Sequence, residues 1–285
     1  MTITNLDHVA LAVRDLDAAV AGLSAMLGRT PEWIGADGGV RHAWFQMEKT
    51  ALDVLCPIGP GFTGDQVRAH LDAHGEGLWA IAYGADDLAK TRKTLVNRGF
   101  TPTEPGRIRV TREGADEKRA WTLLTIPPPQ TAGILTFIID SAQNFDWPQA
   151  ARTADGAIGL DHVVIRSPDP ERAAALYGAR LGLDMRLDRT EPAWGSRLMF
   201  FRCGDLIVEI AHDLAKGASD GPDRPWGLSW RVADADRARA RIAAAGFDAS
   251  DVREGRKPGT RVFTVRNAPA TVPTLFVQPA AKAVA

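Results

Sequence analysis

The chain has 285 residues, with 34 Lys and Arg against 35 Asp and Glu, so its net charge is −1. Hydrophobic residues make up 45% and charged residues 24%, a globular composition with sequence for about two domains. Nucleic-acid binding is not expected without a basic excess, and no apolar run is long enough to span a membrane. With no signal-peptide pattern and 2 cysteines that fit no metal or redox spacing, we expect a cytoplasmic protein.

The first strand of the chain has a copy in the second half. The sequence LDHVALAV at Leu6 to Val13 returns as LDHVVIRS at Leu160 to Ser167. Each run predicts a strand that leads through an Asp-containing turn into an Ala-rich helix ending at Leu-Gly. The segments 79–100 and 226–247 form a second matching pair. Each predicts a short strand, a helix capped by Asp, and a Gly-Phe stop.

Four modules therefore follow one another along the chain. The Asp that starts the helix marks each module, at Asp15, Asp87, Asp169 and Asp234. Later strands are expected at 42–47, 51–56, 121–126, 134–139, 197–202, 206–211, 261–265 and 274–278, with a solvated hairpin over 107–119. We predict an α+β fold in which four βαβββ modules pair into two curved half-barrel sheets with the helices outside. The first domain is expected at 1–141, a polar linker at 142–157 and the second domain at 158–285.

The DHV strands, and the V-x-D-x-D turns VRDLD and VADAD that follow the first strands of the first and fourth modules, resemble the vicinal oxygen chelate superfamily. The resemblance extends from Leu6 to Gln278. The superfamily contains glyoxalase I, extradiol dioxygenases, fosfomycin-resistance enzymes and bleomycin-resistance proteins. The resemblance implies the paired half-barrels and a small-molecule ligand, but one fold hosts many activities.

The resemblance also implies metal ligands on the first and last strands of each half. These are His8 and Asp53 in the first half and His162 and Glu209 in the second. The other first-strand ligand positions hold Ala80 and Gly227. Each half thus has two of the usual three or four ligands, and the second His of two-His-one-carboxylate iron chemistry is missing. One divalent ion (Fe, Mn, Ni or Zn) and a site without metal both remain open.

Glu209 and His162 are the predicted catalytic residues. Glu209 lies in the apolar strand LIVEIA, where burial raises the pKa of a carboxyl unless a metal or cation offsets it. The alternative is a structural ion pair between Glu209 and Arg166 or Arg231.

The same strands supply predicted substrate-binding residues. Because side chains alternate along a strand, Arg166 shares a face with His162, and Ser229 shares one with Arg231. Together with Trp226 they would suit an anionic or keto-acid ligand. The arginines could instead face solvent and the tryptophan could belong to the core. A basic loop within 255–266 could close over this site or be a plain connection between strands.

Three functional hypotheses follow. The first is a glyoxalase-like lyase or isomerase that acts on a carbonyl or enolisable substrate. The second is a non-catalytic small-molecule binder, like the bleomycin-resistance proteins. The third is an extradiol-type dioxygenase with an incomplete ligand set. The first half could be a structural or dimerising copy, and a homodimer is compatible with all three.

Overall fold

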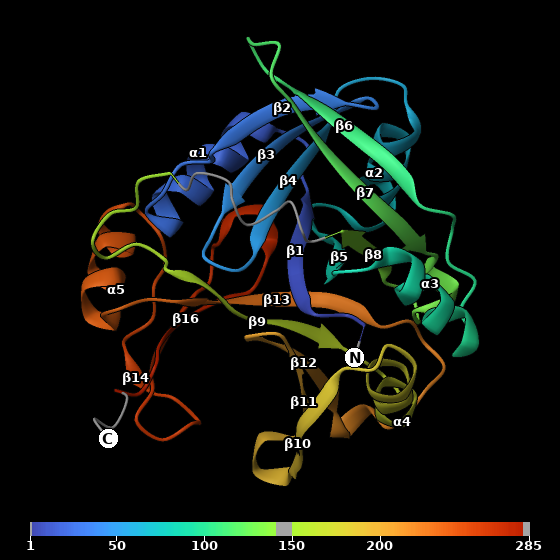
Figure 1. The fold of residues 1–285 in the computed structure, drawn as a ribbon. Coiled ribbons are helices and arrows are strands. Elements are labelled where there is room, and N and C mark those ends of the chain that lie inside the picture. Colours follow the sequence, from blue (N-terminus) through green and yellow to red (C-terminus); the bar gives the residue numbers. More distant parts are fainter. Residues whose placement is uncertain (1, 141–149, 282–285) are drawn as a thin grey trace.

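The computed structural model describes residues 2–140 and 150–281 (Figure 1). The strands of the first half are β1 (Asn5–Ala12), β2 (Trp33–Asp37), β3 (Val40–Gln46), β4 (Ala51–Pro57), β5 (Gly77–Ala85), β6 (Gly106–Arg112), β7 (Lys118–Ile126) and β8 (Leu135–Asp140). Those of the second half are β9 (Gly159–Arg166), β10 (Asp184–Glu191), β11 (Ser196–Cys203), β12 (Leu206–Asp213), β13 (Arg224–Arg231), β14 (Arg253–Glu254), β15 (Arg261–Val265) and β16 (Thr274–Gln278). The α-helices are α1 (Leu16–Leu27), α2 (Phe62–His74), α3 (Leu88–Asn97), α4 (Pro170–Ala173) and α5 (Ala235–Ala244).

The strands form two curved sheets, one from each half of the chain (Figure 1). Strands β1–β8 make a closed barrel in the order β1-β4-β3-β2-β6-β7-β8-β5, and strands β9–β16 make an open sheet in the order β10-β11-β12-β9-β13-β16-β15-β14. The predicted α+β fold with curved sheets is therefore confirmed, and the modules pair first with second and third with fourth. The domain boundaries stay a prediction, because residues 141–149 of the expected linker region lie outside the described residues.

Closure of the first sheet goes beyond the predicted half-barrel. The edge strands β2 and β6 pair, with Gly35 opposite Arg112 and Ala36 opposite Thr111. A Cβ on Gly35 would lie 2.4 Å from the Thr111 carbonyl oxygen, so only glycine allows this approach. In the second sheet the corresponding edge strands β10 and β14 do not pair, and that sheet stays open.

The predicted helix caps are confirmed in all four modules. Each anchoring Asp accepts a hydrogen bond from the backbone N–H three residues on: Asp15 from Ala18, Asp87 from Lys90, Asp169 from Arg172 and Asp234 from Arg237. Such a cap contributes about 1 kcal/mol to stability. The Gly-Phe stops also hold, since Gly99 and Gly246 have φ of 80° and 90°, the left-handed conformation that ends a helix. The third helix departs from expectation, because α4 continues as a π-helix over Ala174–Arg180.

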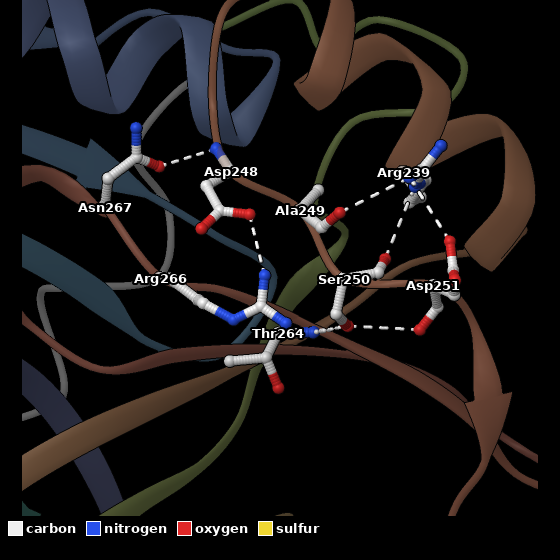
Figure 2. A network of polar contacts seen from close by, with 8 residues as sticks. All are labelled: Arg239, Asp248, Ala249, Ser250, Asp251, Thr264, Arg266 and Asn267. Atoms are coloured by element: carbon white, nitrogen blue, oxygen red, sulfur yellow. Dashed lines mark hydrogen bonds and ion pairs between the residues drawn. The ribbon is translucent and has the colours of Figure 1, made fainter.

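A polar network fixes the segment between α5 and β14 (Figure 2). Arg239 of α5 donates to the backbone oxygens of Ala249 and Ser250. Arg266 pairs with Asp248 at 2.7 Å, and the Ser250 hydroxyl accepts from the backbone of Thr264 at 3.0 Å. The network therefore ties the approach to β14 to both α5 and β15.

Helix α2 covers the interior of the first barrel. Val67 and Leu71 on this helix pack with Ala10 and Ala80 of the barrel strands. The loop that joins β12 to β13 in the second sheet contains only a short 3-10 turn, Leu214–Lys216. Among the described residues, no helix has the length and apolar character needed to cross a bilayer.

Burial makes His70 of α2 an acid-sensitive position. Desolvation lowers the pKa of His70 to about 4, and the nearby His74 contributes. In the unfolded chain a histidine has a pKa of about 6.5. As the pH falls, the unfolded chain therefore binds a proton at a higher pH than the folded chain does. Stability should fall as the pH drops from about 6.5 towards 4. We expect His70→Gln to remove much of this loss and His74→Gln to leave most of it, as measured by urea unfolding at pH 7 and pH 4.5. Equal acid sensitivity in His70→Gln and the wild type would contradict the assignment.

Candidate functional site

The LDH repeat builds the same local geometry in both sheets. His8 on β1 and His162 on β9 each place Nδ1 at 2.8 Å from a carboxylate oxygen of the preceding residue, Asp7 or Asp161. A carboxylate only accepts hydrogen bonds. In the second sheet the ionised Asp161 therefore keeps a proton on Nδ1 of His162 and leaves Nε2 for other partners.

In the second sheet, Nε2 of His162 meets two predicted site residues. It lies 3.3 Å from Oε2 of Glu209 on β12 and 2.7 Å from Oγ of Ser229 on β13. The strand register explains this arrangement, because β9 lies between β12 and β13 and Ser229 stands directly opposite His162. The structure thus brings together three residues that come from separate parts of the sequence.

Glu209 is poised to take up a proton. Only 13% of its side chain is exposed. Burial raises the pKa of its carboxyl, an effect that the neighbouring His162 and Arg256 oppose without cancelling. An unprotonated Nε2 and a carboxylate oxygen both present lone pairs, so they approach each other favourably only with a proton or a cation between them. The anticipated alternative, an ion pair of Glu209 with Arg166 or Arg231, is not formed.

Asp161 contacts the Nδ1 atom of His162, on the side of the ring away from Glu209 and Ser229. Burial acts to raise the pKa of Asp161, but the hydrogen bond to His162 and the charges of Arg231 and Lys257 hold that pKa below its usual value. Asp161 is therefore a stable anion that can fix the orientation of the imidazole. Sequence reasoning missed this role, although the repeated LDH motif contained the signal.

The equivalent residues of the first barrel are arranged differently. Asp53 occupies the position of Glu209, but its carboxylate lies 3.1 Å from Nδ1 of His42 on β3. The strand registers show which residues are equivalent in the two sheets. Leu198 of the second sheet corresponds to His42, and Ala82 of the first sheet corresponds to Ser229. His8 instead packs its ring edge-on against Trp44, 4.9 Å away. The predicted pairing of His8 with Asp53 is therefore not among the contacts of the structure, and His42 is a neighbour that the sequence spacing did not indicate.

The two arginines predicted to bind substrate, Arg166 and Arg231, have different partners. The Arg166 guanidinium stacks on Trp226 at 4.1 Å from the ring centroid. Arg231 instead pairs with Asp161 at 3.5 Å and donates to the Leu160 carbonyl oxygen at 2.9 Å, so its guanidinium is already partnered. Arg256, which sequence reasoning did not single out, lies over Trp194 at 4.1 Å and acts on the charge of Glu209.

The donors at this site do not fit a metal centre. His162 and Glu209 could serve as two neighbouring ligands, but the adjoining strand positions hold Gly227 on β13 and Leu275 on β16, which offer no donor. Within residues 2–140 and 150–281, no three His, Cys, Asp or Glu side chains are grouped so that they could hold a metal ion. Protein zinc sites use at least three protein ligands, and calcium takes six to eight oxygen donors.

Two family models match the chain. The model described as "Glyoxalase-like domain" matches residues 6–182, more than half of the chain. The chain belongs to the glyoxalase-like family. A second model, "Glyoxalase/Bleomycin resistance protein/Dioxygenase superfamily", matches residues 161–264 of this glyoxalase-like protein. The resemblance to the vicinal oxygen chelate superfamily is thereby confirmed.

Individual relatives agree with the family. An ethylmalonyl-CoA/methylmalonyl-CoA epimerase from Cereibacter sphaeroides is 32% identical over 94 residues, which cover 30% of this chain and 70% of the epimerase. A triple mutant of 4-hydroxymandelate synthase from Streptomyces coelicolor has a TM-score of 0.70 at 16% identity, over 98% of this chain and 93% of the synthase. The Mn(II)-bound glyoxalase from Novosphingobium aromaticivorans has a TM-score of 0.67 at 16% identity, over 97% of this chain and 82% of the glyoxalase. At these identities the two structures establish a shared fold alone.

Proposed function

We propose that this glyoxalase-like protein is an enzyme that moves a proton at a carbon next to a carbonyl group, as an isomerase, epimerase or lyase. The observation that carries the proposal is the largely buried group of Glu209, His162 and Ser229, in which burial raises the pKa of Glu209. The epimerase relative supports the same class of reaction.

Each residue has a defined part in the proposed step. The Glu209 carboxylate accepts the proton from the substrate carbon, the electron pair of the broken C–H bond forms the enolate double bond, and the carbonyl oxygen gains the negative charge. The Ser229 hydroxyl and the His162 imidazole, which lie 2.7 Å apart beside Glu209, are the groups that would stabilise that oxygen. Delivery of a proton to the opposite face of the same carbon completes an epimerisation, and delivery to the neighbouring carbon of an enediolate completes an isomerisation.

The residues of this chain carry the proposed step without a resident metal. Their donor set matches acid–base work better than coordination, because the third group beside His162 and Glu209 is the hydroxyl of Ser229, and no third His, Cys, Asp or Glu of the described residues is grouped with them. The extradiol-type dioxygenase hypothesis is the least favoured of the three, since it requires the second His that Gly227 replaces.

Exchange of substrate protons with solvent tests the proposal. The wild-type protein is incubated in D₂O with a panel of small ketones, 2- and 3-oxo acids and thioesters, and loss of the α-proton signal is followed by NMR. We expect catalysed exchange for at least one member of the panel. Tight binding of panel members with no exchange above the uncatalysed rate would instead assign the site to the non-catalytic binders of the superfamily.

A further inference from the structure

The turn at 255–260, between β14 and β15, carries two positive charges that act on carboxyl groups of the second sheet. The guanidinium of Arg256 lowers the pKa of Glu209, and Lys257 lowers that of Asp161, in each case against the opposing effect of burial. Both cations belong to one short turn, on the open side of the second sheet. Sequence alone left open whether this basic segment closes over the site or only connects two strands, and Arg256 is its residue that acts on Glu209.

The turn is held in place from both ends. Gly255 donates from its backbone to Thr260 at 2.8 Å, and the Thr260 hydroxyl donates to the Lys257 carbonyl oxygen at 2.6 Å. The polar network of Figure 2 anchors the segment that precedes β14. Arg256 therefore lies in a turn whose backbone is held by hydrogen bonds.

Arg256 lies over a tryptophan ring, as Arg166 of the same sheet also does. Its guanidinium lies 4.1 Å from the ring centroid of Trp194, in the turn between β10 and β11. Arg189 lies over the same ring at 4.7 Å, but it also pairs with Glu191 at 2.7 Å. Arg256 makes no ion pair with a carboxylate of the described residues, so its N–H groups stay available while the indole covers its face.

We infer that the substrate of this site carries a carboxylate or phosphate group, and that Arg256 binds this group while Glu209 acts on a nearby carbon. The inference rests on the proposed function and adds the class of its substrate. A guanidinium that keeps all its donors beside a buried base matches a bidentate anion. A second negative charge forms on the substrate when the proton leaves, and Arg256 would stabilise that charge as well.

The test compares ligands that differ only in the anionic group. One pair is 2-oxobutyrate and its methyl ester, and the other is dihydroxyacetone phosphate and dihydroxyacetone. Dissociation constants are measured by isothermal titration calorimetry for the wild type, Arg256→Gln, Arg256→Lys and the control Arg237→Gln. Arg237 lies on the exposed surface of α5, so this control removes an equal charge away from the sheet.

In at least one ligand pair, we expect the wild type to bind the anion about tenfold more tightly than the uncharged partner, because one charge-assisted hydrogen bond has an effect of this size. Arg237→Gln should show the same preference. The pair that shows the preference identifies the group as carboxylate or phosphate. Arg256→Gln should lose the preference, and Arg256→Lys should keep part of it, because Lys has the charge without the fork. No preference in either pair, or an unchanged preference in Arg256→Gln, would overturn the inference.

The same variants separate the inference from the proposed function. A charge preference that depends on Arg256, in a protein that exchanges no α-proton, would support the anion site and contradict the enzyme. Loss of Arg256 should also raise the pKa of Glu209, because Arg256 opposes the rise caused by burial while His162 and Asp161 remain. We expect the acidic limb of the pH–rate profile of Arg256→Gln to move to higher pH, and an unmoved limb would place Arg256 outside the field of the base.

Discussion

Glu209→Gln should lower the rate of α-proton exchange by about 10² to 10⁴, the usual contribution of a positioned general base. The change keeps the shape of the side chain but removes the group that accepts the proton. Because the wild-type carboxyl is largely buried and its pKa is raised by burial, replacing it with a neutral amide should leave the melting temperature unchanged or slightly higher. The rate is measured by NMR in D₂O and the melting temperature by calorimetry.

Glu171→Gln is the matched control for this result. Glu171 lies in α4, its side chain is 77% exposed, and it pairs with Arg197 outside the site. It should exchange protons at the wild-type rate. A Glu209→Gln protein that is as active as Glu171→Gln would remove Glu209 from the mechanism. A Glu209→Gln protein that loses its fold would instead place Glu209 in a structural pair with His162.

Arg172→Met should destabilise the protein by about 3–5 kcal/mol, the cost of leaving a buried charge without its partner. The Asp223 side chain is fully buried, and Arg172 donates to its Oδ1 at 2.7 Å and to the Gly221 carbonyl oxygen at 2.8 Å. The backbone N–H of Asp223 also donates to the Ala132 carbonyl oxygen of the first half at 2.6 Å. The pair therefore supports a contact between the two halves, and its loss is measured by urea unfolding.

The pH dependence of this variant has a definite sign. Burial raises the pKa of Asp223, and Arg172 counteracts that rise. Without Arg172 the folded state binds a proton at Asp223 more readily still, so the contribution of Asp223 to the variant's stability is greatest at low pH and is lost as the pH rises through the raised pKa. The loss of stability caused by Arg172→Met should be larger at pH 7.5 than at pH 5, and Asp223→Asn in the same chain should reduce it.

Arg186→Met, which breaks the exposed pair with Asp184, is the control for this variant and should cost less than about 1 kcal/mol.

The repeated segments made most of the fold predictable. The LDHV copies and the Asp caps define four modules, and local rules of strand alternation and helix capping hold in each of them. Closure of the first barrel was not predictable, because it depends on Gly35 meeting a backbone carbonyl of another module. No local pattern indicates which distant edge a short strand will meet.

The site was predictable to the extent that it lies on paired strands. His162, Glu209 and Ser229 come together because the register of neighbouring strands follows from the module repeat. Arg256 was not identified because it lies in a turn, and the direction of a turn depends on tertiary contacts such as that of Arg256 with Trp194. His42 escaped notice because its partner Asp53 is a diagonal neighbour across a hairpin, and spacing along the chain does not reveal such pairs.

The two halves share the LDH repeat but place the equivalent carboxylates, Asp53 and Glu209, against different histidines. The first barrel is closed, covered by α2, and holds its carboxylate against His42. The second sheet is open and holds its carboxylate against His162 beside a hydroxyl. We propose that the first half supports the structure and that the chemistry belongs to the second half.

Metal analysis of the active protein tests most directly whether Glu209 and His162 work by themselves. Protein purified without chelator is assayed for Fe, Mn, Ni and Zn per chain, and α-proton exchange is then compared before and after chelator treatment. We predict no stoichiometric metal and an exchange rate that the chelator leaves unchanged. About one equivalent of a divalent metal, with activity that is lost on its removal and restored on its return, would contradict the account.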